Sequence, residues 1–340
     1  MSLSRPATFP LLKLPFLCIE PVIKCWDILD IIFFALVSQK TRQTVKHFKI
    51  PLNGIKILVR ESKWIELERE SWHFKSKSSE TYLREHFIVR KDPLVLQNNA
   101  NPLYTIRTDH SLVSYTSGNE VNALKMAMEF LNEVFKCSVE LLDIEEGDFP
   151  ESFGIKSTDI LSFRYRNSQP FVSAQNQKLS SLLKSLEVTD ICRFWIKDIE
   201  KDFYVDPKLF KCRELVFGKR SADWVTGEIL LQFEVPRLNF YDCPFSVENI
   251  LSFVTQWFHS DNKKLEYLYF YTQNTQFSIE NFQMDELSAV PFSGRHRVPS
   301  EDTVGYIDFS KGLEIVRHDG LQATIHVGRE NFMFYIWHNQ

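Results

Sequence analysis

The stretch from Phe9 to Lys46 reads FPLLKLPFLCIEPVIKCWDILDIIFFALVSQKTRQTVK and decides how this part of the chain folds. From Ile28 to Val37 every residue except Asp30 is apolar, so the segment lacks the polar face of a surface helix. A segment that is apolar on all sides must be buried on all sides. We therefore expect it to pack on its own neighbours and on a second chain that supplies part of the wall.

Two other interpretations fit this stretch poorly. A membrane span needs roughly 17–25 apolar residues, and this run is about half as long. A signal peptide needs an uninterrupted apolar region, but charged side chains interrupt this one at Lys13, Glu20, Lys24 and Asp27. The pattern favours short packed helices, with Asp27 as an N-cap, Asp30 near the positive end of the helix dipole and Leu14-Pro15 as an extended entry.

The same stretch resembles an F-box, the module that docks a substrate receptor on the Skp-type adaptor of an SCF ubiquitin ligase. The family pattern opens with Leu-Pro, continues through a first apolar helix and an Asp-containing corner, and closes with a helix that ends in Val-Ser. This chain departs from the family pattern at Leu17, Pro21, Trp26 and Gln39. The alternative is an ordinary buried helical hairpin. The resemblance implies that the adaptor contacts are made by Leu14, Pro15, Ile19, Val22, Ile23, Trp26, Asp30, Ile31, Phe34, Leu36, Val37 and Ser38.

Composition narrows the function classes. The chain has 340 residues, enough for two domains or one long one, and 44% of them are hydrophobic, which is ample for a core. It has 11 glycines, so phosphate-cradling loops are not expected, and its net charge of −4 gives no field that favours nucleic acid. The six cysteines form no CxxC pair, which predicts neither zinc nor a redox motif. We expect a reducing compartment, the cytoplasm or nucleus, and no cofactor.

The region 51–118 reads as β-rich. Ile55, Ile57 and Val59 alternate with other residues as in a half-buried strand, and the segment from Trp64 to Phe74 predicts its hairpin partner. Tyr82 to Val89 is a further candidate strand. Asp92 to Ser117 has little periodicity and reads as irregular.

From Asn119 onward, helices and strands alternate. Val121 to Phe135 has one apolar face of helical spacing, and further helices are expected at 179–186, 223–233 and 247–258. A pattern of apolar-x-x-apolar-x-apolar recurs between them, which predicts an irregular leucine-rich-like stack. The alternative is a generic α/β or α+β domain. The pattern recurs at Val139-Leu142-Ile144, Ile160-Phe163-Tyr165, Ile191-Phe194-Ile196, Cys212-Leu215-Phe217, Val235-Leu238-Phe240 and Leu265-Leu268-Phe270.

The last third of the chain resembles the nematode-type F-box-associated domain. In that family an apolar helix ending in Trp precedes a Leu-Glu-x-Leu strand, and an Arg-x-Asp-Gly hairpin follows later. Independently of the resemblance, His318-Asp319-Gly320 predicts a tight turn, because Asp-Gly accepts positive φ angles. The matching residues are Trp257, Asn262, Leu265, Glu266, Leu268, Arg317, Asp319, Gly320, Ala323, Thr324 and Ile325.

No common catalytic signature for nucleotide binding, metalloprotease or serine-hydrolase chemistry is present. His318 and His326 lie near Asp319 in sequence, but decoration of a hairpin is the simpler explanation. Arg295-His296-Arg297 with Lys263-Lys264 reads as a solvated loop, and the acidic run 143–148 as a solvated turn. The alternatives to a non-catalytic receptor are an interaction scaffold, whose first helices complete its own core, and a hydrolase with paired titratable groups in a pocket.

The sequence as a whole predicts an α/β (α+β) fold with an F-box at 8–50, a β-rich connection at 51–118 and an F-box-associated, leucine-rich-like domain at 119–340. The predicted function is substrate recognition in an SCF-type ubiquitin ligase. The expected partners are the Skp-type adaptor with its cullin complex and a target protein, without nucleic acid or membrane.

Overall fold

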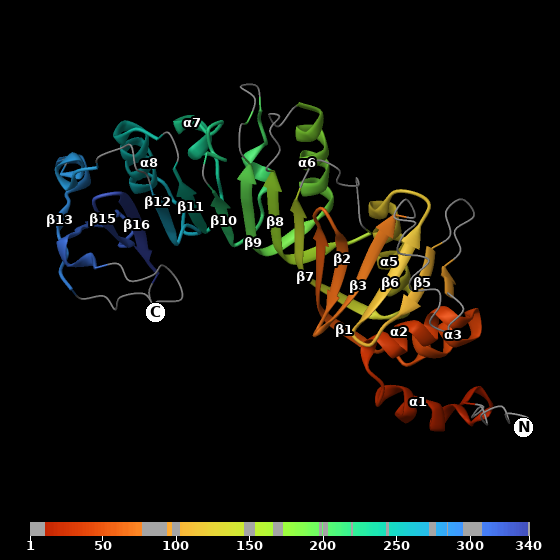
Figure 1. Ribbon diagram of the computed structural model, residues 1–340. Helices are drawn as coiled ribbons and strands as arrows, with labels where there is room; N and C mark the ends of the chain where they lie inside the picture. The colour runs from red at the N-terminus through yellow and green to blue at the C-terminus, as the bar shows by residue number, and fades with distance from the viewer. Residues whose placement is uncertain are drawn as a thin grey trace, which may run out of the picture. The chain divides into compact units, whose positions relative to one another are not determined.

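The structure is a computed structural model, drawn in Figure 1. It describes residues 11–76, 94–96, 103–145, 154–165, 173–196, 199, 203–218, 220–242, 245–271, 277–283, 285–294 and 308–338. The chain divides into two compact units, one of residues 1–142 with 152–155 and the other of residues 143–151 with 156–340. The predicted boundary at residue 119 lies inside the first unit.

Helices open the first unit. A 3-10 turn, η1 (Leu11–Lys13), precedes α1 (Phe16–Lys24), α2 (Ile28–Val37) and α3 (Gln39–His47). As predicted, Asp27 caps α2, and its Oδ1 accepts the Asp30 N–H at 2.8 Å. Ser38 ends α2 and caps α3 through a capping box with Thr41. These two polar residues mark where the apolar helix α2 begins and where it ends.

A sheet forms the rest of the first unit, in the order β7-β1-β2-β3-β6-β5-β4. The helix α5 (Glu120–Val134) packs on it, and the rings of Trp72 and Phe130 meet edge to face at 6.3 Å. The strands are β1 (Pro51–Val59), β2 (Lys63–Leu67), β3 (Glu70–Ser76), β4 (Leu94–Leu96), β5 (Leu103–Arg107), β6 (Ser111–Thr116) and β7 (Lys136–Glu145).

The predicted hairpin is confirmed over β1 and β2, which pair antiparallel with Leu58 facing Trp64. The segment from Trp64 to Phe74, predicted as one partner strand, is instead two strands, β2 and β3, which pair antiparallel across a turn. The prediction that residues 92–117 are irregular is wrong, since β5 and β6 lie there. The Trp72 Nε1–H donates to Ser114 Oγ at 2.7 Å, and β3 runs parallel to β6. This pairing joins residues far apart in sequence, so no local pattern announces it. The candidate strand at 82–89 lies outside the described residues.

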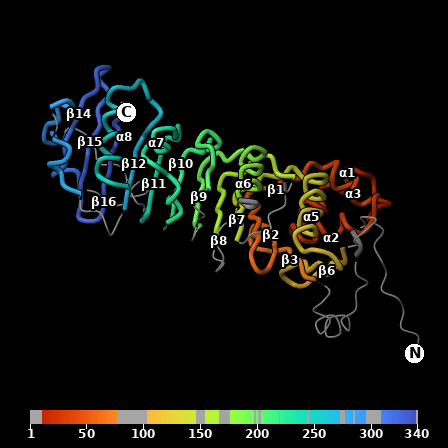
Figure 2. Tube along the Cα trace, turned by 90° about the horizontal axis from the view of Figure 1, so that it is seen from above, coloured from red at the N-terminus to blue at the C-terminus, as the bar shows by residue number. Residues whose placement is uncertain are grey.

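The second unit has a mixed sheet in the order β8-β9-β10-β11-β12-β16-β15-β14-β13. Neighbours from β8 to β12 are parallel, and those from β12 to β13 are antiparallel. Figure 2 shows β8 to β12 and then β16 to β14 in this order. The strands are β8 (Ser157–Tyr165), β9 (Glu187–Ile196), β10 (Glu214–Phe217), β11 (Arg237–Tyr241), β12 (Tyr267–Tyr271), β13 (Val290–Pro291), β14 (Leu313–Val316), β15 (Gln322–Val327) and β16 (Asn331–Trp337).

Helical segments connect these strands. The predicted helices at 179–186 and 247–258 are confirmed, and the one at 223–233 is shorter, with a single turn at α7. The helical segments are α6 (Ser173–Ser185), η2 (Pro207–Leu209), α7 (Gly227–Leu230), α8 (Val247–His259), η3 (Ile279–Phe282), η4 (Asp285–Leu287) and η5 (Phe309–Lys311).

A ladder of phenylalanines forms the core of the second unit. The strand registers place Phe163, Phe194, Phe217, Phe240 and Phe270 side by side on β8 to β12. All are buried, and Phe210, Phe233 and Phe245 from the connections pack against the ladder. All six recurring triplets fall in or directly before strands. The triplets are nevertheless out of phase. The ladder phenylalanine is the second residue of the triplet on β8 and β9, but the third residue on β10 to β12.

The C-terminal hairpin forms with a wider loop than predicted. Val316 pairs with Gln322 and Ile315 with Ala323, and among residues 317–321 only Gly320 has a positive φ, of 87°. A type I′ turn, which Asp-Gly favours, needs positive φ at both central residues. The Asp319 carboxylate is instead bound to Arg317, so the chain makes a five-residue loop closed by Arg317 N–H to Leu321 O at 2.9 Å.

Candidate functional site

One face of α1 is apolar and exposed. Leu17 is 83% exposed and Val22 38% exposed, and neighbouring positions on the same face carry further small or apolar side chains. The opposite face holds the buried Ile19 and Ile23. We call the exposed set, Leu17, Cys18, Pro21, Val22 and Cys25, the α1 stripe. Its spacing of i, i+1, i+4, i+5 and i+8 keeps it on one side of a helix.

The helix continues through Pro21 to Lys24, although Pro21 has no N–H to donate to Leu17. Glu20 and Lys24, one helical turn apart, form an ion pair at 2.7 Å. This pair lies outside the stripe. Phe16 packs on His47 and Phe48, with ring centroids at 4.6 and 4.9 Å, and so holds α1 to the end of α3. The helix is anchored on one side, and none of the residues that the structure describes covers its apolar stripe.

The predicted adaptor-contact residues divide into surface and interior groups. Pro15, Val22, Asp30, Val37 and Ser38 are exposed, and Leu14, Trp26 and Phe34 are half-buried. Ile19, Ile23, Ile31 and Leu36 are buried among the helices. The Ser38 hydroxyl caps α3, and the Trp26 and Phe34 rings meet edge to face at 5.2 Å. The buried members therefore shape the helices, and the exposed ones are available to a partner.

An arginine that sequence reasoning missed fixes the corner between α1 and α2. Arg107, on β5, lies 3.4 Å from Asp27 and 3.2 Å from Asp30, and its side chain is 11% exposed. It also approaches Glu70 at 3.9 Å, where burial and the nearby Asp27 raise the carboxyl pKa and Arg107 opposes that rise. Nothing local to Arg107 marks this role, because its acidic partners are about 80 residues earlier in the chain.

At the other end of the N-terminal helices, α3 packs on α5. The Arg42 guanidinium lies 5.1 Å from the centre of the Phe130 ring and 3.7 Å from the Glu133 carboxylate. Beside the α1–α2 corner is a hollow of about 660 Å³, lined by Trp26, Ile31, Phe48 and Leu67 among others. The helices are thus built into the first unit on one side, whereas the α1 stripe faces outward.

The Arg-x-Asp-Gly motif has a structural role in the second unit. The Arg317 side chain is fully buried and donates to both Asp319 carboxylate oxygens, at 2.9 and 2.7 Å. It also donates to Asn262 O at 2.8 Å and lies 4.9 Å from the centre of the Trp257 ring. Three other residues of the predicted family pattern are therefore brought together around the buried Arg317 cation.

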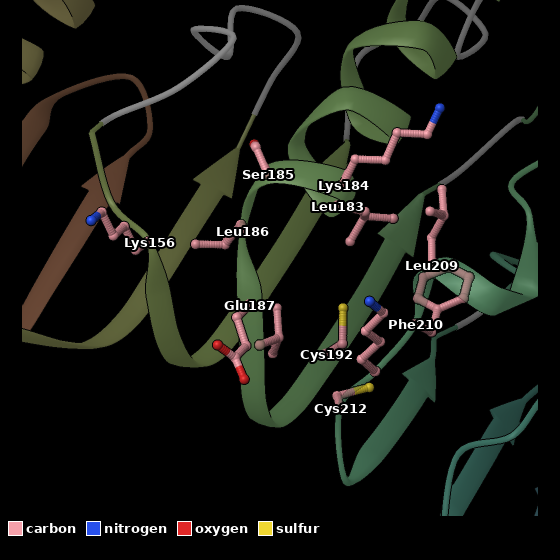
Figure 3. A pocket seen from close by; sticks show the side chains of 12 residues that line it. Lys156, Leu183, Lys184, Ser185, Leu186, Glu187, Cys192, Leu209, Phe210 and Cys212 are labelled. Atoms are coloured by element: carbon pink, nitrogen blue, oxygen red, sulfur yellow. The ribbon is translucent and has the colours of Figure 1, made fainter.

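The best-enclosed pocket among those described lies beside η2 and has a volume of about 430 Å³. Figure 3 shows the thiols of Cys192 and Cys212 near each other, whereas the amines of Lys156 and Lys184 point away from them. Burial and the neighbouring Cys212 thiol raise the pKa of Cys192, which keeps its thiol protonated. Ser185 donates to Leu182 O, so it is not paired with a base there.

The two histidines near Asp319 do not assemble an acid–base pair with it. His318 lies 3.6 Å from Asp261 on the surface, and the Asp319 carboxylate is bound to Arg317. His326 packs on the Phe309 ring, and burial lowers its pKa despite the opposing effect of Asp308. The Arg295–Arg297 patch lies outside the described residues.

Within the described ranges, no His, Cys, Asp or Glu side chains gather in the threes needed to hold a metal ion. None of the helices in those ranges combines the length and apolar composition needed to cross a bilayer.

Comparison with known proteins supports the resemblance to the F-box-associated domain. Residues 208–270, from η2 through β12 apart from its last residue, match a family described as F-box associated. The predicted resemblance to that family is confirmed over this segment, and the chain carries an F-box-associated region.

Two Caenorhabditis elegans proteins are similar to this chain. Uncharacterized protein F59B2.9 is 26% identical over 140 residues, 39% of this chain and 32% of that protein. Uncharacterized protein F59B2.8 is 22% identical over 339 residues, 93% of this chain and 74% of that protein. The chain thus spans about a third of the length of the first relative and about three quarters of the second. No solved structure matches.

Proposed function

We propose that this chain is the substrate-recognition subunit of an SCF-type ubiquitin ligase. The observation that carries the proposal is the α1 stripe, an exposed apolar helix face beside helices whose isoleucines and leucines are mostly buried. The F-box-associated match at residues 208–270 supports it, because that family is named for its association with the F-box.

In this proposal the Skp-type adaptor covers the α1 stripe together with Leu14, Pro15 and Val37. Ile19, Ile23, Ile31 and Leu36 hold the helices in shape, while Trp26, Phe34, Asp30 and Ser38 border the docking surface. Burial of a large apolar side chain contributes about 1.5–3 kcal/mol, so two losses are enough to weaken docking severely. The cullin complex supplies the transfer chemistry in the cytoplasm or nucleus, and this chain acts by proximity without a cofactor.

The second unit holds the target protein in this account. We interpret β8 to β12, with their helical connections, as a leucine-rich-like stack, since successive units cover the phenylalanine ladder from neighbouring strands. The alternative role, a scaffold whose first helices only complete its own core, is favoured by the burial of Ile19, Ile23, Ile31 and Leu36 but leaves the α1 stripe unexplained.

Co-expression with a Skp-type adaptor tests the proposal. The wild type is expected to co-purify, and the double variant Leu17→Ala/Val22→Ala to lose most of the adaptor without losing its fold, because both side chains are exposed. The control is Val290→Ala/Val316→Ala, which removes exposed apolar groups of the second unit, 51% and 46% exposed. A wild type that stays a soluble monomer beside the adaptor would favour the scaffold.

A further inference from the structure

The second unit presents aromatic side chains on the sheet face opposite the phenylalanine ladder. Side chains alternate between the two faces of a strand, so Trp195 and Tyr241 follow the ladder residues Phe194 and Phe240 on the other face. Trp195 is 42% exposed and Tyr241 36% exposed. Tyr269 and Tyr271 continue the set on β12, and we call Trp195, Tyr241, Tyr269 and Tyr271 the aromatic row.

The rings of the aromatic row contact one another across three strands. Trp195 stacks with Tyr241 at 6.4 Å between ring centroids and 23° between planes. Tyr241 meets Tyr269 at 5.9 Å and Tyr271 at 6.4 Å. The row is therefore a continuous aromatic surface rather than scattered side chains.

Gly218 makes this surface possible. It follows β10, between the strands that carry Trp195 and Tyr241, and its N–H donates to Phe194 O at 2.7 Å. A Cβ at this position would lie 1.9 Å from Trp195 Cε3 and 2.4 Å from Cδ2. The indole lies directly over the glycine backbone, so only a residue without a side chain lets Trp195 reach toward Tyr241.

Three polar atoms of the row are free to donate hydrogen bonds. Among the described residues, Trp195 Nε1, Tyr241 Oη and Tyr269 Oη have no hydrogen-bond partner, whereas Tyr271 Oη donates to Glu330 at 3.1 Å. Burial raises the pKa of Tyr241 and of Tyr269, so both hydroxyls stay protonated and able to donate. A ligand that carries free carbonyl oxygens can accept hydrogen bonds from these groups.

Two opposite charges lie near the row, Arg193 on β9 and Glu214 on β10, and each acts on the other. Arg193 points to the same face of β9 as Trp195, and no ion-pair or hydrogen-bond partner for it occurs among the described side chains. Its neighbour Arg164 is already paired with Asp143 at 3.5 Å. The β9 side of the row therefore favours a negative group on the ligand.

We propose that the aromatic row docks a proline-rich segment of a target protein, with an acidic residue beside the prolines pairing with Arg193. Polyproline II segments have solvated carbonyls, proline has no N–H, and aromatic grooves bind its rings. This inference rests on the proposed function, because it names the kind of segment that the receptor would hold.

Fluorescence anisotropy on the full chain tests the proposal with two labelled oligoproline peptides, one flanked by glutamates and one by lysines. The glutamate peptide is expected to bind more tightly, by about fivefold for one exposed ion pair. Arg193→Gln should abolish that preference and retain binding. Trp195→Ala should weaken both peptides at least about tenfold, as for a central aromatic anchor.

Gly218→Ala provides an independent variant, because it displaces the Trp195 ring while keeping every side chain of the row. It is expected to weaken binding in the same direction. Tyr204→Ala is the matched control, since Tyr204 is an aromatic residue of the same unit that is 47% exposed and lies outside the row. Its affinity should equal that of the wild type.

Several results would overturn the proposal: no binding of either peptide, equal binding by wild type and Trp195→Ala, or tighter binding of single-stranded oligothymidine, which would assign the row to nucleic acid. Adaptor co-purification separates this from the proposed function. Peptide binding without adaptor binding contradicts the ligase role alone, and adaptor binding without peptide binding contradicts the docking proposal alone.

Discussion

Arg317 shows how one residue organises the C-terminal part of the second unit. Its guanidinium is fully buried and reaches the Asp319 carboxylate, the Asn262 carbonyl and the face of Trp257. A buried charge is tolerated only when it is paired and hydrogen-bonded, and here each of these partners is present. The signature that resembles the F-box-associated family is therefore a folding device and leaves recognition to other residues.

Asp319 should make stability depend on pH. Its hydrogen bonds to Arg317 hold the carboxyl pKa well below its usual range. A depressed folded-state pKa contributes stability above the unfolded pKa of about 4, and that contribution is lost as the pH falls toward the folded pKa. We expect the free energy of unfolding to drop below about pH 4, and to drop less in Asp319→Asn, measured by urea unfolding across pH. Parallel curves for the two proteins would contradict this.

Asp27 has two separable roles at the residue scale. Its carboxylate caps α2 and lies near Arg107. Asp27→Asn keeps an oxygen for the cap and removes the charge, which should cost less than about 1 kcal/mol for an exposed pair. Asp27→Ala should cost about 1 kcal/mol more, because the cap is lost as well. Thermal unfolding of both variants measures the difference, and equal destabilisation would show that the cap contributes nothing.

At the scale of elements, the phenylalanine ladder binds the parallel strands into one core. Phe217 stacks on Phe194 at 5.6 Å and on Phe240 at 5.1 Å. Phe217→Ala should cost about 3–5 kcal/mol, and Phe217→Leu, which leaves a smaller cavity, under about 1.5 kcal/mol. Native-state hydrogen exchange of β9 to β11 resolves this unit from the first. Val316→Ala, an exposed control, should change protection by under about 0.5 kcal/mol, and a similarly small change in Phe217→Ala would refute the ladder's role.

Local signals predicted local elements well. Asp27 as a cap, the helix at 121–135 and the β1–β2 hairpin follow from side chains within a few residues of one another. The strand β6 was missed because Ser114 finds its partner Trp72 at a distance of 42 residues. The phase of the repeated triplets also required the strand registers, since Phe163 and Phe217 occupy different positions of the same pattern.

The sequence predicts contact residues but does not tell which of them are exposed. Sequence placed an apolar surface near Leu14 to Ser38, yet apolar letters alone do not distinguish the buried Ile19 from the exposed Val22. Helical spacing contained the missing signal, since positions 17, 18, 21, 22 and 25 share a face. Arg107 carried no such signal, because its role depends on tertiary folding.

At the scale of the whole molecule, we propose that the first unit docks on the adaptor and the second captures the target. It follows that variants of the aromatic row should leave adaptor binding intact, and variants of the α1 stripe should leave peptide binding intact. Ubiquitin transfer to a target would then need both surfaces in one chain, because the chain contributes proximity and the ligase contributes chemistry.

Hydrogen–deuterium exchange of the full chain, with and without the Skp-type adaptor, shows whether the α1 stripe is the docking surface. We expect new protection in peptides that cover Phe16–Lys24 and the end of α2 at Val37, with β10 to β12 unchanged. Absence of a complex, or a complex in which exchange of α1 is unaltered, would contradict the claim that the α1 stripe is the docking surface.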